Sequence, residues 1–122
     1  MNAVQDRIEL SLLADYYGAF LTENQRELIK LSCDEDLSLS EIAEQKGISR
    51  QGVRDSIARG SRILSEMEAK LGLIARDRKA ASLMSGIKRE IESGEGDASK
   101  KLDMIRPMIA GLSKILEGKD GI

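Results

Sequence analysis

Residues 38–62, SLSEIAEQKGISRQGVRDSIARGSR, have the order of a helix-turn-helix unit. Ser38 and Glu41 have the spacing of a capping box, in which each side chain satisfies a free backbone amide at the start of a helix. Gly47 suits the turn that ends this short helix, and Ser49 can cap the next one. The small or apolar residues that the inner side and the turn need are Ala43, Ile48, Val53 and Ile57. The stretch therefore predicts a capped short helix, a tight turn and a second helix, within a unit over about residues 38–64.

The second helix of this unit carries a basic outer face. If its apolar residues face the core, a rotation of about 100° per residue turns Gln51, Asp55, Ala58 and Arg62 outward, with Arg54 and Arg59 on the flanks. In recognition helices, arginine binds guanine and glutamine binds adenine, each through two hydrogen bonds. Arg59 and Arg62 suit phosphates. The candidate nucleic-acid-binding residues are Ser49, Arg50, Gln51, Arg54, Arg59 and Arg62.

Charge is distributed unevenly around this helix. Residues 47–62 hold four Arg against one Asp, a local surplus of +3, whereas the whole chain has a net charge of −2. The segment before it is acidic, with Asp34, Glu35, Asp36, Glu41 and Glu44. Few phosphate contacts imply weak and salt-dependent binding unless a dimer doubles them. A simply solvated arginine face and a protein-docking surface remain the alternatives, because helix-turn-helix units also bind proteins.

Composition narrows the fold and the chemistry. The chain has 122 residues, 41% of them hydrophobic and only 2% aromatic, so its core must be aliphatic, which favours an all-α fold. It has no His and one Cys, which excludes a histidine base, a Cys/His zinc site and an internal disulfide. Phosphate loops and paired carboxylates in a recognisable setting are also missing. We therefore expect no enzyme, no metal and no cofactor, and assign Cys33 no role.

Two further features of the sequence bear on the cellular location of the protein. No stretch approaches the roughly 20 apolar residues of a membrane span. The first residues, MNAVQDRIEL, carry charges where a signal peptide would be apolar. We expect a cytoplasmic protein without membrane insertion.

Hydrophobic periodicity places the other helices. A helix over about residues 4–17 would have Gly18 as its C-terminal cap, with Ile8, Leu10, Leu12, Leu13 and Tyr16 crowded on one side. Thr22 opens a second capping box, for a helix that ends near Cys33. The helix that follows Ser49 continues to Gly72. We expect residues 1–73 to form the helix-turn-helix domain.

Residues 74–122 are expected to form a C-terminal helical hairpin. Its two apolar seams consist of Ala80, Met84, Ile87 and Ile91, and of Leu102, Ile105, Ile109, Leu112 and Leu116. The loop between them is Ser93 to Gly96. Pro107 predicts a kink or two short helices in the second arm. The seams must pack either within the chain or against a second copy, which would make a homodimer.

The N-terminal sequence resembles a known family. LLADYYGAFLTENQRELIKL (residues 12–31) and DLSLSEIAEQKGISRQGVRDSI (residues 36–57) look like the YlxM-like family, small bacterial helix-turn-helix proteins that resemble region 4 of sigma factors. The similarity covers about residues 8–75. Family members usually carry more aromatics around Ala14 and before Asp34, Ala at position 52 and commonly Tyr at position 54, where this chain has Gly52 and Arg54.

The resemblance implies an all-helical, cytoplasmic, non-enzymatic protein. Its sigma-like module implies DNA binding through Ser49, Arg50, Gln51 and Arg54, in a regulatory protein. The family's genes lie beside those of the signal recognition particle GTPase, which implies a role in that pathway. The alternative partners are therefore signal recognition particle RNA and the GTPase itself, for which the chain would be an accessory module.

Overall fold

The structure, a computed structural model, describes residues 3–94 and 96–118, and its regular elements over these residues are helices without a strand. The all-α prediction is confirmed. Two compact units divide the chain, Met1–Leu71 and Gly72–Ile122. We call them the N-terminal unit and the C-terminal hairpin.

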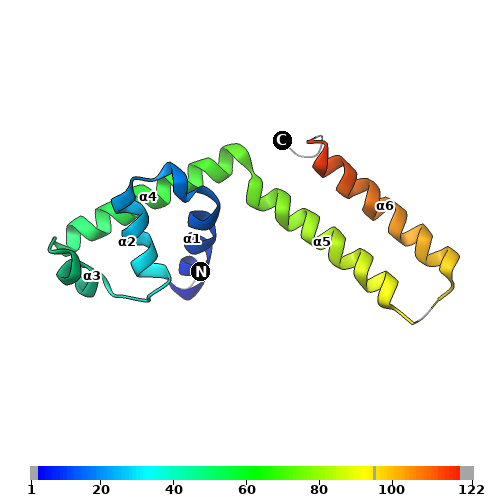
Figure 1. The fold of residues 1–122 in the computed structure, drawn as a ribbon, viewed down its shortest axis with the longest axis horizontal. Coiled ribbons are helices and arrows are strands. Elements are labelled where there is room, and N and C mark those ends of the chain that lie inside the picture. Colours follow the sequence, from blue (N-terminus) through cyan, green and yellow to red (C-terminus); the bar gives the residue numbers. More distant parts are fainter. Residues whose placement is uncertain (1–2, 95, 119–122) are drawn as a thin grey trace. The chain divides into compact units, whose positions relative to one another are not determined.

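The N-terminal unit packs three helices against one long helix (Figure 1). Its elements are α1 (Ala3–Tyr17), the 3-10 turn η1 (Gly18–Phe20), α2 (Glu23–Cys33), α3 (Leu39–Lys46) and α4 (Arg50–Leu71). A cluster of buried side chains joins α2, α3 and α4, and consists of Leu28, Leu31, Ile42, Ala43 and Val53. These aliphatic residues supply the core that the sparse aromatics could not.

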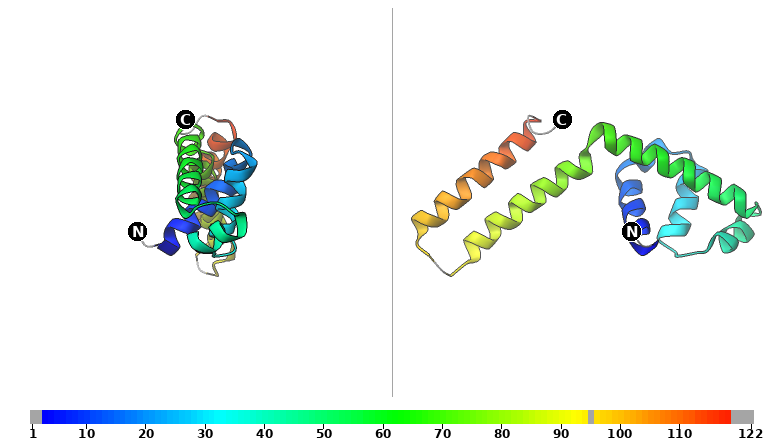
Figure 2. Two further views of the ribbon diagram at one scale, coloured as in Figure 1. Left: turned by 90° about the vertical axis from the view of Figure 1, so that its left-hand side faces the viewer. Right: turned by 180° about the vertical axis from the view of Figure 1, so that it is seen from behind.

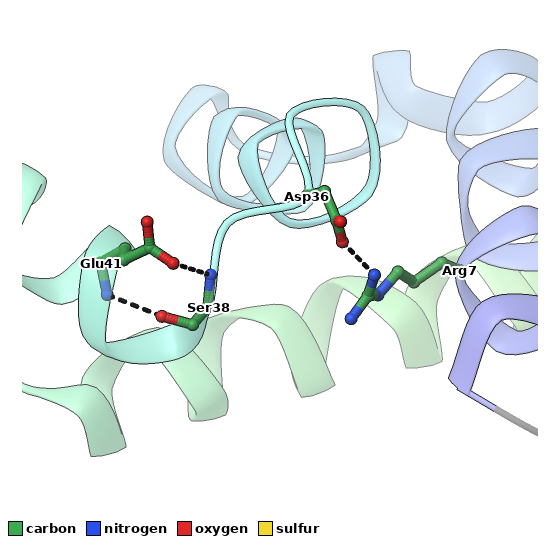
Figure 3. Close-up of polar contacts among 4 residues, drawn as sticks. All are labelled: Arg7, Asp36, Ser38 and Glu41. Carbon is green, nitrogen blue, oxygen red and sulfur yellow. Dashed lines mark hydrogen bonds and ion pairs between the residues drawn. The ribbon is translucent and has the colours of Figure 1, made fainter.

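Both predicted capping boxes are present. Thr22 Oγ1 accepts a hydrogen bond from the Gln25 amide at 3.1 Å, and the Gln25 side chain accepts one from the Thr22 amide. Ser38 and Glu41 repeat this arrangement at the start of α3 (Figure 3). Each box satisfies backbone amide groups that a helix start leaves without a partner. Thr22 and Ser38, the N-cap residues, therefore fix where α2 and α3 begin.

The first helix differs from its prediction in two respects. Ile8, which the pattern placed on the packed side, is 56% exposed, whereas Tyr17 is buried and donates its hydroxyl proton to Glu68 on α4. Gly18 is not a left-handed cap, because it has no positive φ and instead starts η1. The Arg26 side chain donates to the Gly18 carbonyl at 3.2 Å, so a side chain from α2 holds this turn.

The C-terminal hairpin consists of α5 (Leu73–Glu92) and α6 (Ala98–Leu116), which run antiparallel (Figure 2). Gly86 lies under the Met108 side chain, where an added Cβ would be 3.1 Å from its sulfur. The second arm is one continuous helix across Pro107, so the prediction of two short helices is wrong. Pro107 is exposed, so water can solvate the carbonyl that loses its partner.

Candidate nucleic-acid interface

The helix-turn-helix geometry is set by a tight turn between α3 and α4. Gly47 ends α3 in the left-handed conformation, at φ 68° and ψ 32°, which a residue with a side chain rarely adopts. The Ile48 amide then donates to the Ala43 carbonyl at 3.1 Å. Ile42 and Val53, on either side of the turn, are both fully buried. The buried pair fixes which side of α4 faces outward, although Ile48 itself stays 44% exposed.

Four exposed arginines lie on α4, three of them around its outward side and one at its start. Arg50, Arg54, Arg59 and Arg62 are all exposed, and none forms an ion pair or hydrogen bond through its side chain within the described ranges. Arg50 and Arg62 are 12 positions apart, or about 18 Å along the helix. Arg54, Arg62 and Arg59 lie within about 140° around the axis, whereas Arg50 lies about 180° from Arg59. Arg54, Arg59 and Arg62 are therefore available to a polyanion along one side of the helix, and Arg50 extends from its exposed first turn.

The first turn of α4 is organised by Ser49. Its hydroxyl oxygen accepts a hydrogen bond from the Gly52 amide at 2.9 Å, as expected of an N-cap. A Cβ on Gly52 would lie 3.2 Å from that oxygen, so glycine here leaves room for the capped conformation. The hydroxyl of Ser49, a predicted binding residue, is thus already used by the helix start.

Gln51 has a partner that the sequence prediction did not include. Its side-chain nitrogen donates to Asp55 Oδ1 at 2.8 Å, one helical turn away. The pair lies on the exposed side of the helix, and Asp55 places a negative charge among the arginines. The i, i+4 spacing on one helix face could have indicated this contact. To bind a base through both amide atoms, Gln51 must leave Asp55.

The acidic residues before α4 are partly used within the fold. Asp36 pairs with Arg7 of α1, as Figure 3 shows, and Glu27 of α2 pairs with Lys46 of α3. The first pair joins α1 to the loop between α2 and α3, and the second joins α2 to α3. Glu35 and Glu44 remain exposed beside the motif. The unit therefore has a basic face on α4 and an acidic side on its α2–α3 segment.

Other chemistry in the N-terminal unit is sparse. An open hollow of about 540 Å³ runs along α1, lined by Arg7, Ile8, Ser11, Leu12, Asp15, Cys33 and Asp36. Burial raises the pKa of the Cys33 thiol, nearby Asp34 raises it further, and Arg7 lowers it in part. Such a thiol is less nucleophilic at neutral pH than an exposed one. Over the residues described, no three His, Cys, Asp or Glu side chains gather as a metal site would need.

Within the ranges that the structure describes, no helix combines the length and apolar character required to cross a bilayer.

Comparison with protein families agrees with this geometry. Residues 4–105 match the UPF0122 family model, described as "Putative helix-turn-helix protein, YlxM / p13 like". The match covers the whole N-terminal unit from residue 4 and continues through α5 into α6. The description is of a helix-turn-helix protein and names no reaction.

Individual relatives extend over most of the chain. A UPF0122 protein of Desulforamulus reducens is 38% identical over 115 residues, which cover 93% of this chain and 96% of the relative. One of Clostridium kluyveri is 40% identical over 107 residues, covering 87% and 96%. One of Acetivibrio thermocellus reaches 53% over 66 residues, covering 54% and 56%. The chain belongs to the UPF0122 family of YlxM / p13-like helix-turn-helix proteins.

Proposed function

We propose that this chain is a DNA-binding regulatory protein without catalytic activity, which inserts α4 into the major groove. One observation carries the proposal, namely four exposed arginines on the second helix of a helix-turn-helix, none of which has a side-chain partner among the described residues. In such motifs the second helix contacts base edges through its N-terminal part. The site of action would be the cytoplasm, where bacterial DNA lies.

The position of each side chain on α4 gives it a role. Arg50 and Gln51, at the leading end of the helix, would reach base edges. Arg54 can contact either a base or the backbone, because it lies one turn further along. Arg59 and Arg62 lie further from the leading end and would bind phosphates. Ser49 would act by holding the first turn in its capped conformation.

The small number of arginines sets the strength of binding. Each neutralised phosphate contributes a slope of about −0.9 to the dependence of log K on log salt. Three or four contacts give a weak site with modest salt dependence. We therefore propose that two copies act together on neighbouring half-sites, which would double the contacts without any new chemistry.

A titration of duplex DNA with single variants tests the proposal. Arg50→Ala and Arg54→Ala should each weaken binding by about 1–3 kcal/mol if the arginine contacts a base. Arg89→Ala is the matched control, because it removes the same charge from an exposed site on α5. Circular dichroism should show unchanged helicity in all three. Unchanged affinity in both α4 variants would remove the proposal.

The acidic side of the unit favours a second candidate function. Exposed Glu35 and Glu44 repel phosphates but suit a basic protein surface. With the family resemblance, this favours an accessory module that docks on the signal recognition particle GTPase, with the particle's RNA as the alternative partner. Co-purification of the chain with the GTPase after nuclease treatment would support protein docking. Loss of the complex on nuclease addition would assign the contact to RNA.

A further inference from the structure

The C-terminal hairpin exposes large apolar side chains in a regular pattern. Six of these described side chains are 49% to 77% exposed. Met104 lies apart from the others, which are Met84 and Ile91 on α5, and Leu102, Ile109 and Leu116 on α6. Within each helix these residues recur every seven positions. Ala80, Ile87, Ile105 and Leu112, which are less exposed, lie between them at spacings of three and four. This is the repeat of a helix that packs against further helices through a narrow apolar seam.

The two exposed stripes lie on the same side of the hairpin. Leu83 and Met108 mark the sides on which α5 and α6 face each other, because each lies over a glycine of the opposite helix. From Leu83, the exposed stripe of α5 is about 80–100° further round in the chain direction. From Met108, the stripe of α6 is about 80–120° further round in the same sense. In an antiparallel pair, equal rotations of this kind bring both stripes to one face.

The opposite side of the hairpin is mostly polar, although exposed Met104 lies on that flank of α6. Its exposed residues include Arg78, Ser82, Arg89, Asp103 and Lys114. A hairpin with one apolar and one charged side buries only part of its apolar surface by closing on itself. The face formed by Met84, Ile91, Leu102, Ile109 and Leu116 therefore has the composition of an interface, and we call it the open face.

We propose that the open face binds the open face of a second copy, so that two hairpins form a four-helix bundle. A twofold interface must be complementary to itself, and the apolar side chains of the open face meet this condition between Met84 and Ile91 and between Leu102 and Leu116, with the exposed Asp77 at the end of the α5 stripe. Seams with spacings of three and four are those of four-helix bundles. If the two helices of each copy make contact over their full length of about 30 Å and a width of about 10 Å, each copy offers at most about 600 Å². Two copies together then bury up to about 1,200 Å², the lower end of the range of stable interfaces.

The dimer stands independently of nucleic-acid binding. Its evidence lies in α5 and α6, whereas the arginines of the proposed DNA site lie in α4. The measurement below is made without nucleic acid, so either proposal can fail while the other stands.

Light scattering on the full chain, from micromolar to submillimolar concentration, tests the dimer. The mass should be twice the 13.4 kDa of one chain. Ile109→Glu, on the open face, should halve the mass, because the charge would be buried in the bundle. Ala110→Glu is the matched control, since it places the same charge at the next residue of α6, which is also exposed but on the outer side. It should leave the mass doubled.

Two further measurements keep the result decisive. Circular dichroism should show the same helicity for both variants. If Ile109→Glu loses helicity, Met84→Glu on α5 replaces it, and a halved mass with full helicity supports the proposal. A 13.4 kDa wild-type chain at every concentration overturns it, as would happen if the N-terminal unit or another protein covers the open face. A doubled mass that both open-face variants retain also overturns it.

Discussion

The two units of this chain close their apolar surfaces to different degrees. Among the described residues, the N-terminal unit has nine buried apolar side chains and the C-terminal hairpin has three. Exposed large apolar residues show the opposite distribution among the described residues, with four in the first unit and six in the hairpin. Three helices packed on α4 can enclose a core, whereas two helices cannot. The first unit therefore encloses its own core, whereas the hairpin leaves apolar side chains exposed, which is the basis of the proposed dimer.

The largest contrast should come from truncating one side chain in each unit. Leu64 is fully buried in α4, and Leu64→Ala should lower the free energy of unfolding by about 2–5 kcal/mol. Ile109 is 54% exposed, so Ile109→Ala should cost about 0.5 kcal/mol or less where the chain is monomeric. Urea unfolding at low protein concentration, followed by circular dichroism, measures both. Equal losses of unfolding free energy in the two variants would mean that the hairpin also has a closed core.

Close-approach glycines sharpen the same comparison. A Cβ on Gly60 would lie 2.8 Å from Ile29 Cδ1, and Ile29 is itself buried. Gly60→Ala should therefore destabilise the fold by about 1 kcal/mol, although alanine has a higher helix propensity than glycine. A Cβ on Gly86 would meet only the flexible Met108 side chain, at 3.1 Å. Gly86→Ala should therefore be neutral or stabilising by up to about 1 kcal/mol. The thermal unfolding midpoints would contradict this account if Gly86→Ala proved the more harmful change.

A smaller effect is expected from the capping box of α3. Ser38→Ala removes the acceptor for the Glu41 amide and should cost about 1 kcal/mol. Ser40→Ala is the control, because Ser40 is exposed within the same helix and its side chain is not part of the cap. Urea midpoints of the two variants provide the comparison. Equal midpoints would show that the box does not fix the start of α3.

The smallest expected effect is a change in the free energy of unfolding at alkaline pH. Because burial raises the pKa of Cys33, the folded state favours the thiol form. That preference is fully present below the pKa of the unfolded thiol and is lost as the pH rises through the folded pKa. Wild-type stability should therefore fall more between neutral and alkaline pH than that of Cys33→Ser. Parallel pH profiles of the two unfolding free energies would contradict the assigned environment.

Local rules predicted the motif well because its signals are short in range. The capping boxes at Thr22 and Ser38, and the left-handed Gly47, depend on residues three or four positions apart. The same spacing determines which side of α4 is outward. These features follow from hydrogen-bond geometry that a sequence shows directly.

Predictions that depend on packing were weaker. The buried Tyr17 donates a hydrogen bond from its hydroxyl group to Glu68, which is 51 residues away. No local sequence pattern shows this contact. Gly18 begins a 3-10 turn because Arg26 holds its carbonyl from another helix. Continuity across Pro107 depends on the exposure of that part of α6. The roles of Arg50, Gln51, Arg54, Arg59 and Arg62 in binding stay predictions, because exposure alone does not identify a partner.

The salt dependence of DNA binding tests the central claim most directly. Fluorescence anisotropy of a labelled duplex, titrated at several salt concentrations, gives the slope of log K against log salt for wild type, Arg62→Ala and Arg89→Ala. If α4 binds phosphates, Arg62→Ala should make the slope shallower by about 0.9 per lost contact, and Arg89→Ala should leave it unchanged. Identical slopes for wild type and Arg62→Ala, or an equal change in Arg89→Ala, would contradict binding through the arginine face of α4.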